Sequence, residues 1–168
     1  MAYEPWQPGM IVTQGRLASI SATWQDWTPV WTTSTGANSP SFGNAVMTTR
    51  YAVNATTVMF NINITFGTTT NFGGGGSADN WRFSLPVAAA NLTLMIGYGE
   101  LSDSSVGIAS RMGARPRLTT TTTMEIEMAA GRLDAGSVSG AGLIDAVSPW
   151  TWATSDTLRA FGEYEAAA

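Results

Sequence analysis

Large apolar residues alternate with smaller or polar ones along much of the chain from residue 24 onward. The clearest case runs from Val58 to Phe66, where every second residue is Val, Phe or Ile. A period of two is typical of a β-strand with one buried face. The same alternation predicts strands over residues 81–85, 92–98, 118–128 and 157–165.

Clusters of Gly, Ser, Thr, Asn and Asp separate these strands. They fall at residues 34–41, 67–71, 73–80, 99–105 and 131–142. Such residues favour tight turns, so many short strands are joined by short connections. This arrangement predicts an all-β fold, an antiparallel β-sandwich or jelly-roll-like domain with a short N-terminal arm. The run Thr119–Thr123 continues the alternation, and since Thr is β-branched we expect it to lie within a strand.

The beginning of the chain has a different pattern, because prolines and a glycine there oppose regular structure. We therefore divide the chain into an N-terminal anchoring arm over residues 1–23 and a β-sandwich domain over residues 24–168. An arm with no core of its own must bury its apolar side chains against something else. The expected anchor residues are Trp6, Pro8, Met10, Ile11, Val12 and Leu17.

Two descriptions of residues 1–20 remain open at this point. The segment is either an arm that docks on another protein, with a short helix near Thr13–Ile20, or an N-terminal strand of the same domain. Trp6 is the best candidate for an anchor between proteins, because prolines flank it on both sides.

Charge limits the classes of partner. Charged residues make up 12% of the 168 residues, about half the usual share of roughly 25%. Weak repulsion between copies suits an oligomer or a lattice component. The net charge of −4 argues against binding nucleic acid, which needs a basic surface. No apolar run is long enough to span a membrane and no secretion-signal pattern begins the chain, so we expect no membrane insertion.

The absence of three residue types limits the chemistry. The chain has no His, no Cys and no Lys, since all eight basic residues are Arg. Catalytic triads, thiol nucleophiles, lysine Schiff bases and His-based metal sites are therefore excluded, and we expect no enzyme, no catalytic residues, no metal and no cofactor. Carboxylates remain. Glu125 and Glu127 lie two apart in an expected strand, so both should face water, and a pair of carboxylates is the device of glycosidases. A solvated strand face that discourages edge pairing is the preferred interpretation.

Seven tryptophans are the other distinctive feature. Exposed indole rings stack on sugars or anchor interfaces, whereas buried ones fill a core. We expect core packing for Trp81 and for one of the pair Trp150 and Trp152. The candidates for surface recognition are Trp24, Trp27, Trp150 and Trp152. Acidic loop residues at Asp79 and at Glu100 to Asp103 could offer oxygen to calcium, but turn formation explains them more simply.

Spaced aromatic, Gly and Pro residues also carry a resemblance. In the main body these are Trp27–Trp31, Gly36–Pro40, Gly43–Asn44, Tyr51, Val58, Phe66–Thr70, Phe72–Gly73 and Trp81–Pro86. Near the two ends they are Trp6–Gly9, Thr13, Arg16–Leu17, Trp150–Trp152, Asp156–Leu158 and Gly162–Glu165. With these residues most of the chain resembles a structural β-domain of tailed bacteriophages, especially of the actinobacterial type, found in tail-fibre, minor tail and head-associated virion proteins.

The resemblance implies a homotrimer on the virion surface, assembled in the host cytoplasm. Its partners would be other copies of itself and either the major capsid protein or tail proteins. Because the chain lacks any shaft-building repeat, we expect a capsid decoration protein whose arm binds and stabilises the shell. The alternative is a minor tail or tail-fibre protein that recognises a host cell-wall glycan. A carboxylate glycosidase is the remote alternative.

Overall fold

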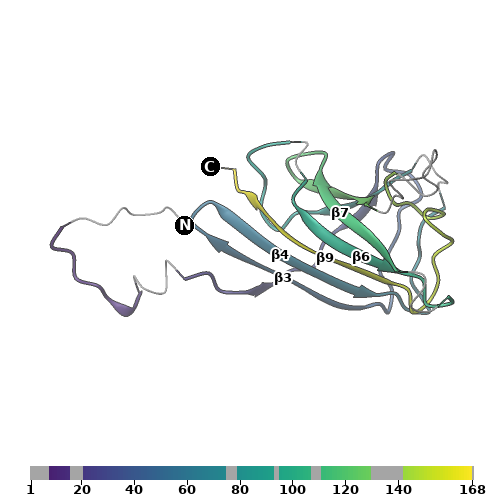
Figure 1. Ribbon diagram of the computed structural model, residues 1–168, viewed down its shortest axis with the longest axis horizontal. Coiled ribbons are helices and arrows are strands. Elements are labelled where there is room, and N and C mark those ends of the chain that lie inside the picture. The colour runs from purple at the N-terminus through teal and green to yellow at the C-terminus, as the bar shows by residue number, and fades with distance from the viewer. Residues whose placement is uncertain are drawn as a thin grey trace, which may run out of the picture.

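The structure is a computed structural model that describes residues 8–15, 21–74, 79–92, 95–106, 111–129 and 142–167. Within these residues nine strands form one antiparallel sheet in the order β1-β3-β4-β9-β6-β7-β8-β5-β2 (Figure 1). The strands are β1 (Gln25–Asp26), β2 (Trp31–Thr33), β3 (Val46–Asn54), β4 (Thr57–Thr65), β5 (Trp81–Ser84), β6 (Gly97–Ser102), β7 (Met112–Leu118), β8 (Thr123–Met128) and β9 (Thr157–Glu165). The all-β class is thus confirmed.

The sheet curls into a half-barrel because its two edge strands, β1 and β2, are neighbours in the chain. A flat sheet of nine strands would separate its edges by about 38 Å. Residues 27–30 join β1 to β2 and allow a span of only about 18 Å. At one end of this crossing the Trp27 N–H donates to the Thr49 carbonyl at 3.0 Å, and at the other the Ser84 N–H donates to the Val30 carbonyl at 2.9 Å.

The concave side of the curled sheet holds the core. Strand β4 contributes Val58, Phe60, Ile62 and Ile64, each at most 1% exposed. Their alternation with outward residues is what the sequence pattern predicts. Strand β9 pairs with β4 along its whole length and adds Leu158, Ala160 and Tyr164 to the core.

Aromatic residues fill part of this core. Trp31 of β2 and Trp81 of β5 meet edge to face, with ring centroids 4.6 Å apart and planes at 84°. Phe66 and Phe83 stack against Trp31 at 5.7 Å. Edge-to-face and stacked contacts add to the free energy gained by burial, so this aromatic cluster is a main source of stability. The cluster consists of Trp31, Phe66, Phe72, Trp81, Phe83 and Trp152.

Three of the predicted strands are confirmed. The segments expected over Val58–Phe66, residues 81–85 and residues 157–165 correspond to β4, β5 and β9. Strand β3 was not among the predicted strands, although it is as long as β4. The turn expected at residues 67–71 is present, and its Gly67 carbonyl accepts from the Thr70 N–H at 3.3 Å. Most of the turn expected over residues 131–142 lies outside the described residues.

The strand predicted over residues 92–98 is wrong in position. Strand β6 begins at Gly97 and continues to Ser102, so part of the turn expected at residues 99–105 is strand. Gly97 marks a close approach of two backbones and not a turn, because a Cβ atom there would lie 2.0 Å from the Phe161 carbonyl oxygen of β9. Leu92 was expected on the buried face but is 48% exposed.

The strand predicted over residues 118–128 is interrupted. Strand β7 ends at Leu118, and β8 begins at Thr123. Between them the Thr120 hydroxyl accepts hydrogen bonds from the backbone N–H groups of Thr122 at 3.2 Å and Thr123 at 2.9 Å. Threonine hydroxyls that capture nearby N–H groups favour turns. Most of the threonine run is therefore the turn of a β7–β8 hairpin, and the prediction of a continuous strand was wrong.

In the part of the chain that the structure describes, no helix has the length and apolar character needed to cross a membrane.

Candidate functional site

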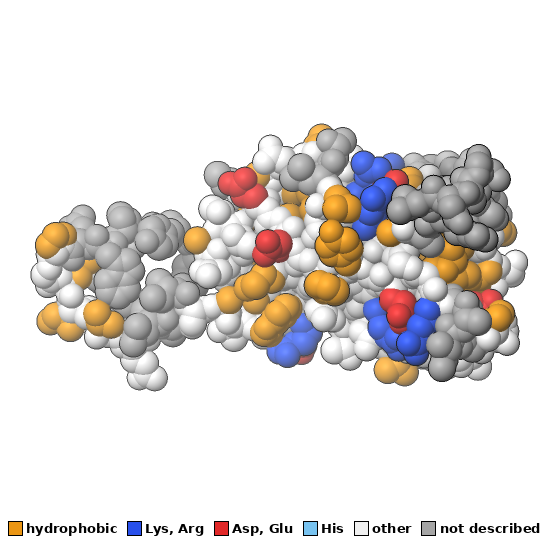
Figure 2. Space-filling model, in the orientation of Figure 1, with side chains coloured by type: hydrophobic (Ala, Val, Ile, Leu, Met, Phe, Trp, Pro, Cys, Tyr) orange, Lys and Arg blue, Asp and Glu red, His pale blue; other side chains and the backbone are white. Residues whose placement is uncertain are grey.

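The arm exposes apolar side chains. Ile11 is 80% exposed and Val12 is 52% exposed, while Met10 is half-buried and Pro8 is exposed. Residues 8–15 lie beyond one end of the sheet, and hydrophobic side chains are visible on this arm (Figures 1 and 2). Of the short helix expected near Thr13–Ile20, only Thr13 to Gly15 are described. The expected anchors Trp6 and Leu17 lie outside the described residues.

The four tryptophans considered for surface recognition divide into three cases. Trp24 is 42% exposed. Trp27 and Trp150 are partly buried and pack against the core. Trp152 is only 4% exposed, and its indole N–H donates to the Asp145 carbonyl at 2.9 Å. Trp152 is therefore the member of its pair that fills the core and has almost no surface with which to contact a ligand.

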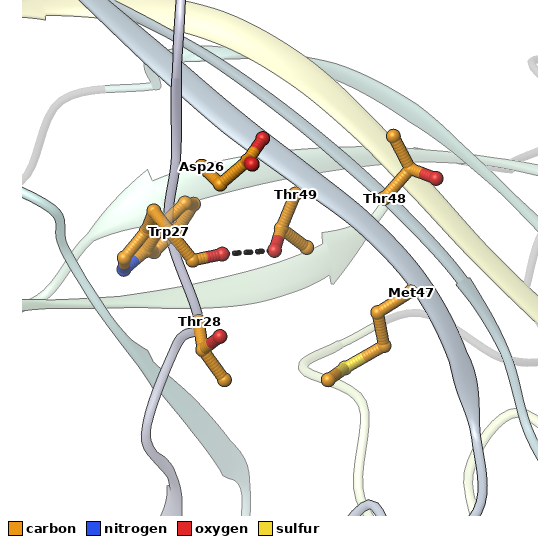
Figure 3. A pocket seen from close by; sticks show the side chains of 6 residues that line it. All are labelled: Asp26, Trp27, Thr28, Met47, Thr48 and Thr49. Carbon is orange, nitrogen blue, oxygen red and sulfur yellow. Dashed lines mark hydrogen bonds between the residues drawn. The ribbon is translucent and has the colours of Figure 1, made fainter.

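A groove opens between β3 and the segment that follows β1. In Figure 3 the two segments separate beyond the hydrogen bond that the Thr49 hydroxyl donates to the Trp27 carbonyl. The side chains of Thr28 and Met47 lie on opposite sides of the gap. The groove has a volume of about 310 Å³, at the lower end of the range for ligand pockets. It is lined by Asp26, Trp27, Thr28, Met47, Thr48 and Thr49.

This groove follows an open sheet edge. Strand β4 pairs with β3 from Val46 to Asn54, but β1 pairs only with Arg50 and Tyr51 on the other side. Beyond the Trp27 to Thr49 hydrogen bond, no described strand pairs with residues 46–48 on that side. Because the Thr49 carbonyl points toward β1, the backbone groups of Met47, two residues earlier, point the same way. The edge at residues 46–48 can thus accept another strand.

A second hollow lies on the convex face of β4, β9 and β6, with a volume of about 430 Å³. Its lining includes a directly opposed pair, Tyr98 of β6 and Phe161 of β9, which are 60% and 58% exposed. Beside them Arg159 contacts Glu100 at 3.1 Å. Figure 2 shows hydrophobic side chains gathered over this face next to paired basic and acidic groups. An exposed aromatic pair with polar neighbours can stack on a flat ligand.

The carboxylates of β8 differ from the sequence-based expectation. Glu125 was predicted to face water, but it is 3% exposed and contacts Arg82 Nε of the neighbouring strand at 2.7 Å. Glu127 contacts Arg115 at 2.9 Å and Arg117 at 3.3 Å. Arginines on both neighbouring strands therefore engage these carboxylates, and this arrangement ties β5, β8 and β7 together. The alternation alone places Glu125 on the convex face but cannot show that cross-strand neighbours cover it.

Two other titratable groups hold loops in place. The Thr35 hydroxyl donates to Asp79 Oδ1 at 2.6 Å, and this hydrogen bond lowers the pKa of Asp79 below its usual value. Burial raises the pKa of Tyr164 to about 12, and its hydroxyl donates to the Val87 carbonyl at 2.7 Å. Both groups fix connections between strands and neither lines one of the two hollows.

Among the described residues, no three Asp or Glu side chains come together in a way that could hold a metal ion. Asp103, considered for calcium, accepts from the N–H of Ser105 at 2.8 Å and so stabilises its own turn. Comparison of the chain with protein families, with curated proteins and with solved structures finds no match.

Proposed function

We propose that the protein is a non-enzymatic structural component of a bacteriophage virion, a decoration protein that binds the head surface through its N-terminal arm and stabilises the shell. The exposure of Ile11 and Val12 carries this proposal. The domain completes its own core without these side chains, so their apolar area is available to a partner. Full burial of an aliphatic side chain contributes about 1.5–3 kcal/mol.

The resemblance to phage structural domains supports the same role. From this resemblance the proposal also includes that the protein forms a homotrimer and that its strands are arranged as in a jelly roll. The low charge is compatible with close packing of copies, since interface cores are depleted in charged residues. On a shell, the capsid protein would receive the arm, and the domain would lie above it.

The alternative, a tail protein that recognises a host cell-wall glycan, is favoured by one observation. Tyr98 and Phe161 form an exposed aromatic pair beside the Arg159–Glu100 ion pair. Aromatic rings stack on sugar faces, and charged side chains hydrogen-bond to hydroxyls. Loss of glycan binding on Phe161→Ala, with an unchanged fold, would support this second role.

The experiment that tests the main proposal is localisation of the protein on purified particles by cryo-electron microscopy. A variant carrying both Ile11→Asp and Val12→Asp is compared with Val106→Asp, which changes an apolar side chain that is 61% exposed and lies outside the arm. We expect density on the head with the Val106 variant and none with the arm variant. Density confined to the tail tip, or retained head density with the arm variant, would contradict the proposal.

A further inference from the structure

The open edge of β3 and the exposed arm fit each other. We propose that Ile11 and Val12 of a second copy of this chain add as a strand to residues 46–48 of β3, in the groove beside Trp27. This inference rests on the proposed role of the arm as a docking segment, and it adds a contact between neighbouring copies to the contact that the arm as a whole would make with the shell. Strand addition to an exposed sheet edge is a common way of binding an extended peptide.

The backbone supplies the first reason. The position next to β3 is occupied by β1 opposite Arg50 and Tyr51, and by Trp27 opposite Thr49. Beyond Trp27 none of the described strands takes this position, because the chain turns away toward β5, where Val30 pairs with Ser84. An added strand would continue the place of β1 and satisfy the backbone N–H and C=O of Met47.

The edge also lacks the side chains that commonly prevent pairing. Natural edge strands carry Lys, Pro or inward-pointing charges that prevent another chain from adding. Residues 46–48 are Val, Met and Thr, and Val46 is 72% exposed. An unprotected edge of this kind is a liability unless it has an occupant.

The arm has the composition that the edge requires. Ile11, Val12 and Thr13 are β-branched and favour a strand. Residues 8–15 contain no charged side chain, and neither do residues 46–48, so no repulsion opposes the contact. In an added strand, neighbouring side chains point to opposite faces. One of the pair Ile11 and Val12 can therefore contact the half-buried Met47, which lines the groove.

Geometry favours a second copy over the same copy. In Figure 1 the arm lies at the end of the long axis toward which β3 runs, whereas residues 46–48 begin β3 at the opposite end. Each copy thus offers an arm at one end and an edge at the other. Such a contact between different surfaces links copies head to tail, and the assembly closes into a ring or extends as a filament.

Disulfide trapping in the full chain tests the proposal, because the protein has no native cysteine. One population carries Val12→Cys, and a second population with a larger tag carries Thr48→Cys. The two are mixed and oxidised. We expect a disulfide-linked product that contains one chain of each size. The matched control carries Asn54→Cys in place of Thr48→Cys. Asn54 is also exposed and lies on the same face at the other end of β3, so we expect little mixed product from it.

Equal trapping at both β3 sites, or no mixed product, would overturn the proposal. A double variant with both cysteines in one chain gives a further decisive outcome, since a disulfide formed only within single chains shows that each arm folds back on its own edge. Failure here is distinguishable from failure of the proposed function. If arm variants abolish attachment to the particle but no mixed product forms, the arm docks on the shell and not on β3.

Discussion

Two regions of the molecule differ in the burial of their apolar side chains. In the aromatic cluster, Trp31, Trp81 and Phe83 are at most 5% exposed and contact one another. In the arm, Ile11 and Val12 are mostly exposed, and residues 46–48 pair with β4 on one side but with no described strand on the β1 side. With the strand addition proposed above, folding and assembly would depend on separate residues. Substitutions in one region should therefore change stability alone, and substitutions in the other should change association alone.

The largest effect is expected for Trp81→Ala. Trp81 is fully buried and donates its indole N–H to the Phe72 carbonyl at 3.2 Å. Removing such a side chain leaves a cavity, so the free energy of unfolding should fall by about 3–5 kcal/mol. Denaturant unfolding followed by circular dichroism measures it. Trp24→Ala removes the same side chain from a 42% exposed site and should cost far less, and similar losses in the two variants would show that burial in the aromatic cluster does not set the cost.

A smaller loss is expected for Arg82→Ala. The substitution leaves the Glu125 carboxylate buried without its closest partner at 2.7 Å. Breaking a buried pair costs about 3–5 kcal/mol, but Arg82 is partly exposed, so a loss of about 2 kcal/mol is expected. Adding Glu125→Gln should restore part of the stability, since a neutral amide is less costly to bury. No recovery in the double variant would show that Arg82 acts through packing instead.

Alkaline pH should destabilise the fold through Tyr164. The pKa of Tyr164 is about 12 in the folded chain and about 10 when unfolded, so the neutral form stabilises the native state. The contribution is complete below pH 10 and is lost as pH rises toward 12. The chain has no Lys or Cys, so its side chains that titrate in this range are tyrosines. Tyr164→Phe should flatten the dependence measured by thermal unfolding across this range, and an unchanged slope would assign the effect elsewhere.

The smallest effect on stability is expected for Ile11→Asp. Because Ile11 is 80% exposed, the free energy of unfolding should change by less than about 0.5 kcal/mol. Sedimentation velocity should nevertheless show loss of self-association, since the added charge opposes entry into an apolar groove. If unfolding becomes much easier, the arm belongs to the domain's own core and the comparison between the two regions fails.

The sequence identifies a strand correctly where buried and exposed residues alternate along the strand itself. Strand β4 has buried residues at every second position, and its alternation identifies it correctly. The threonine run has the same alternation and yet forms a turn, because the Thr120 hydroxyl binds nearby N–H groups. Pattern alone cannot distinguish these two cases, since both use β-branched residues.

Other features depend on neighbours that are distant in the chain. Glu125 is buried because Arg82 lies beside it in the sheet, although 43 residues separate them in sequence. The prolines and glycine at the start of the chain predict an arm, and Ile11 and Val12 are exposed there, while their role as an anchor stays a prediction. The open edge of β3 could not be predicted, because it results from where β1 stops pairing. The sequence therefore suggests which segment could dock, the apolar arm. The surface proposed to bind it, the open edge of β3, is recognised only in the folded structure.

The position of β9 has a consequence for synthesis of the protein. Strand β9 is the last of the nine in the chain, but it lies in the middle of the sheet between β4 and β6. Until it leaves the ribosome, the strands on its two sides have no common neighbour, and the backbone edge of β4 that pairs with β9 stays open. Prematurely ended chains should therefore remain unfolded and accessible to proteases. Because the sheet is completed only by β9, unfinished copies stay open to removal by proteases.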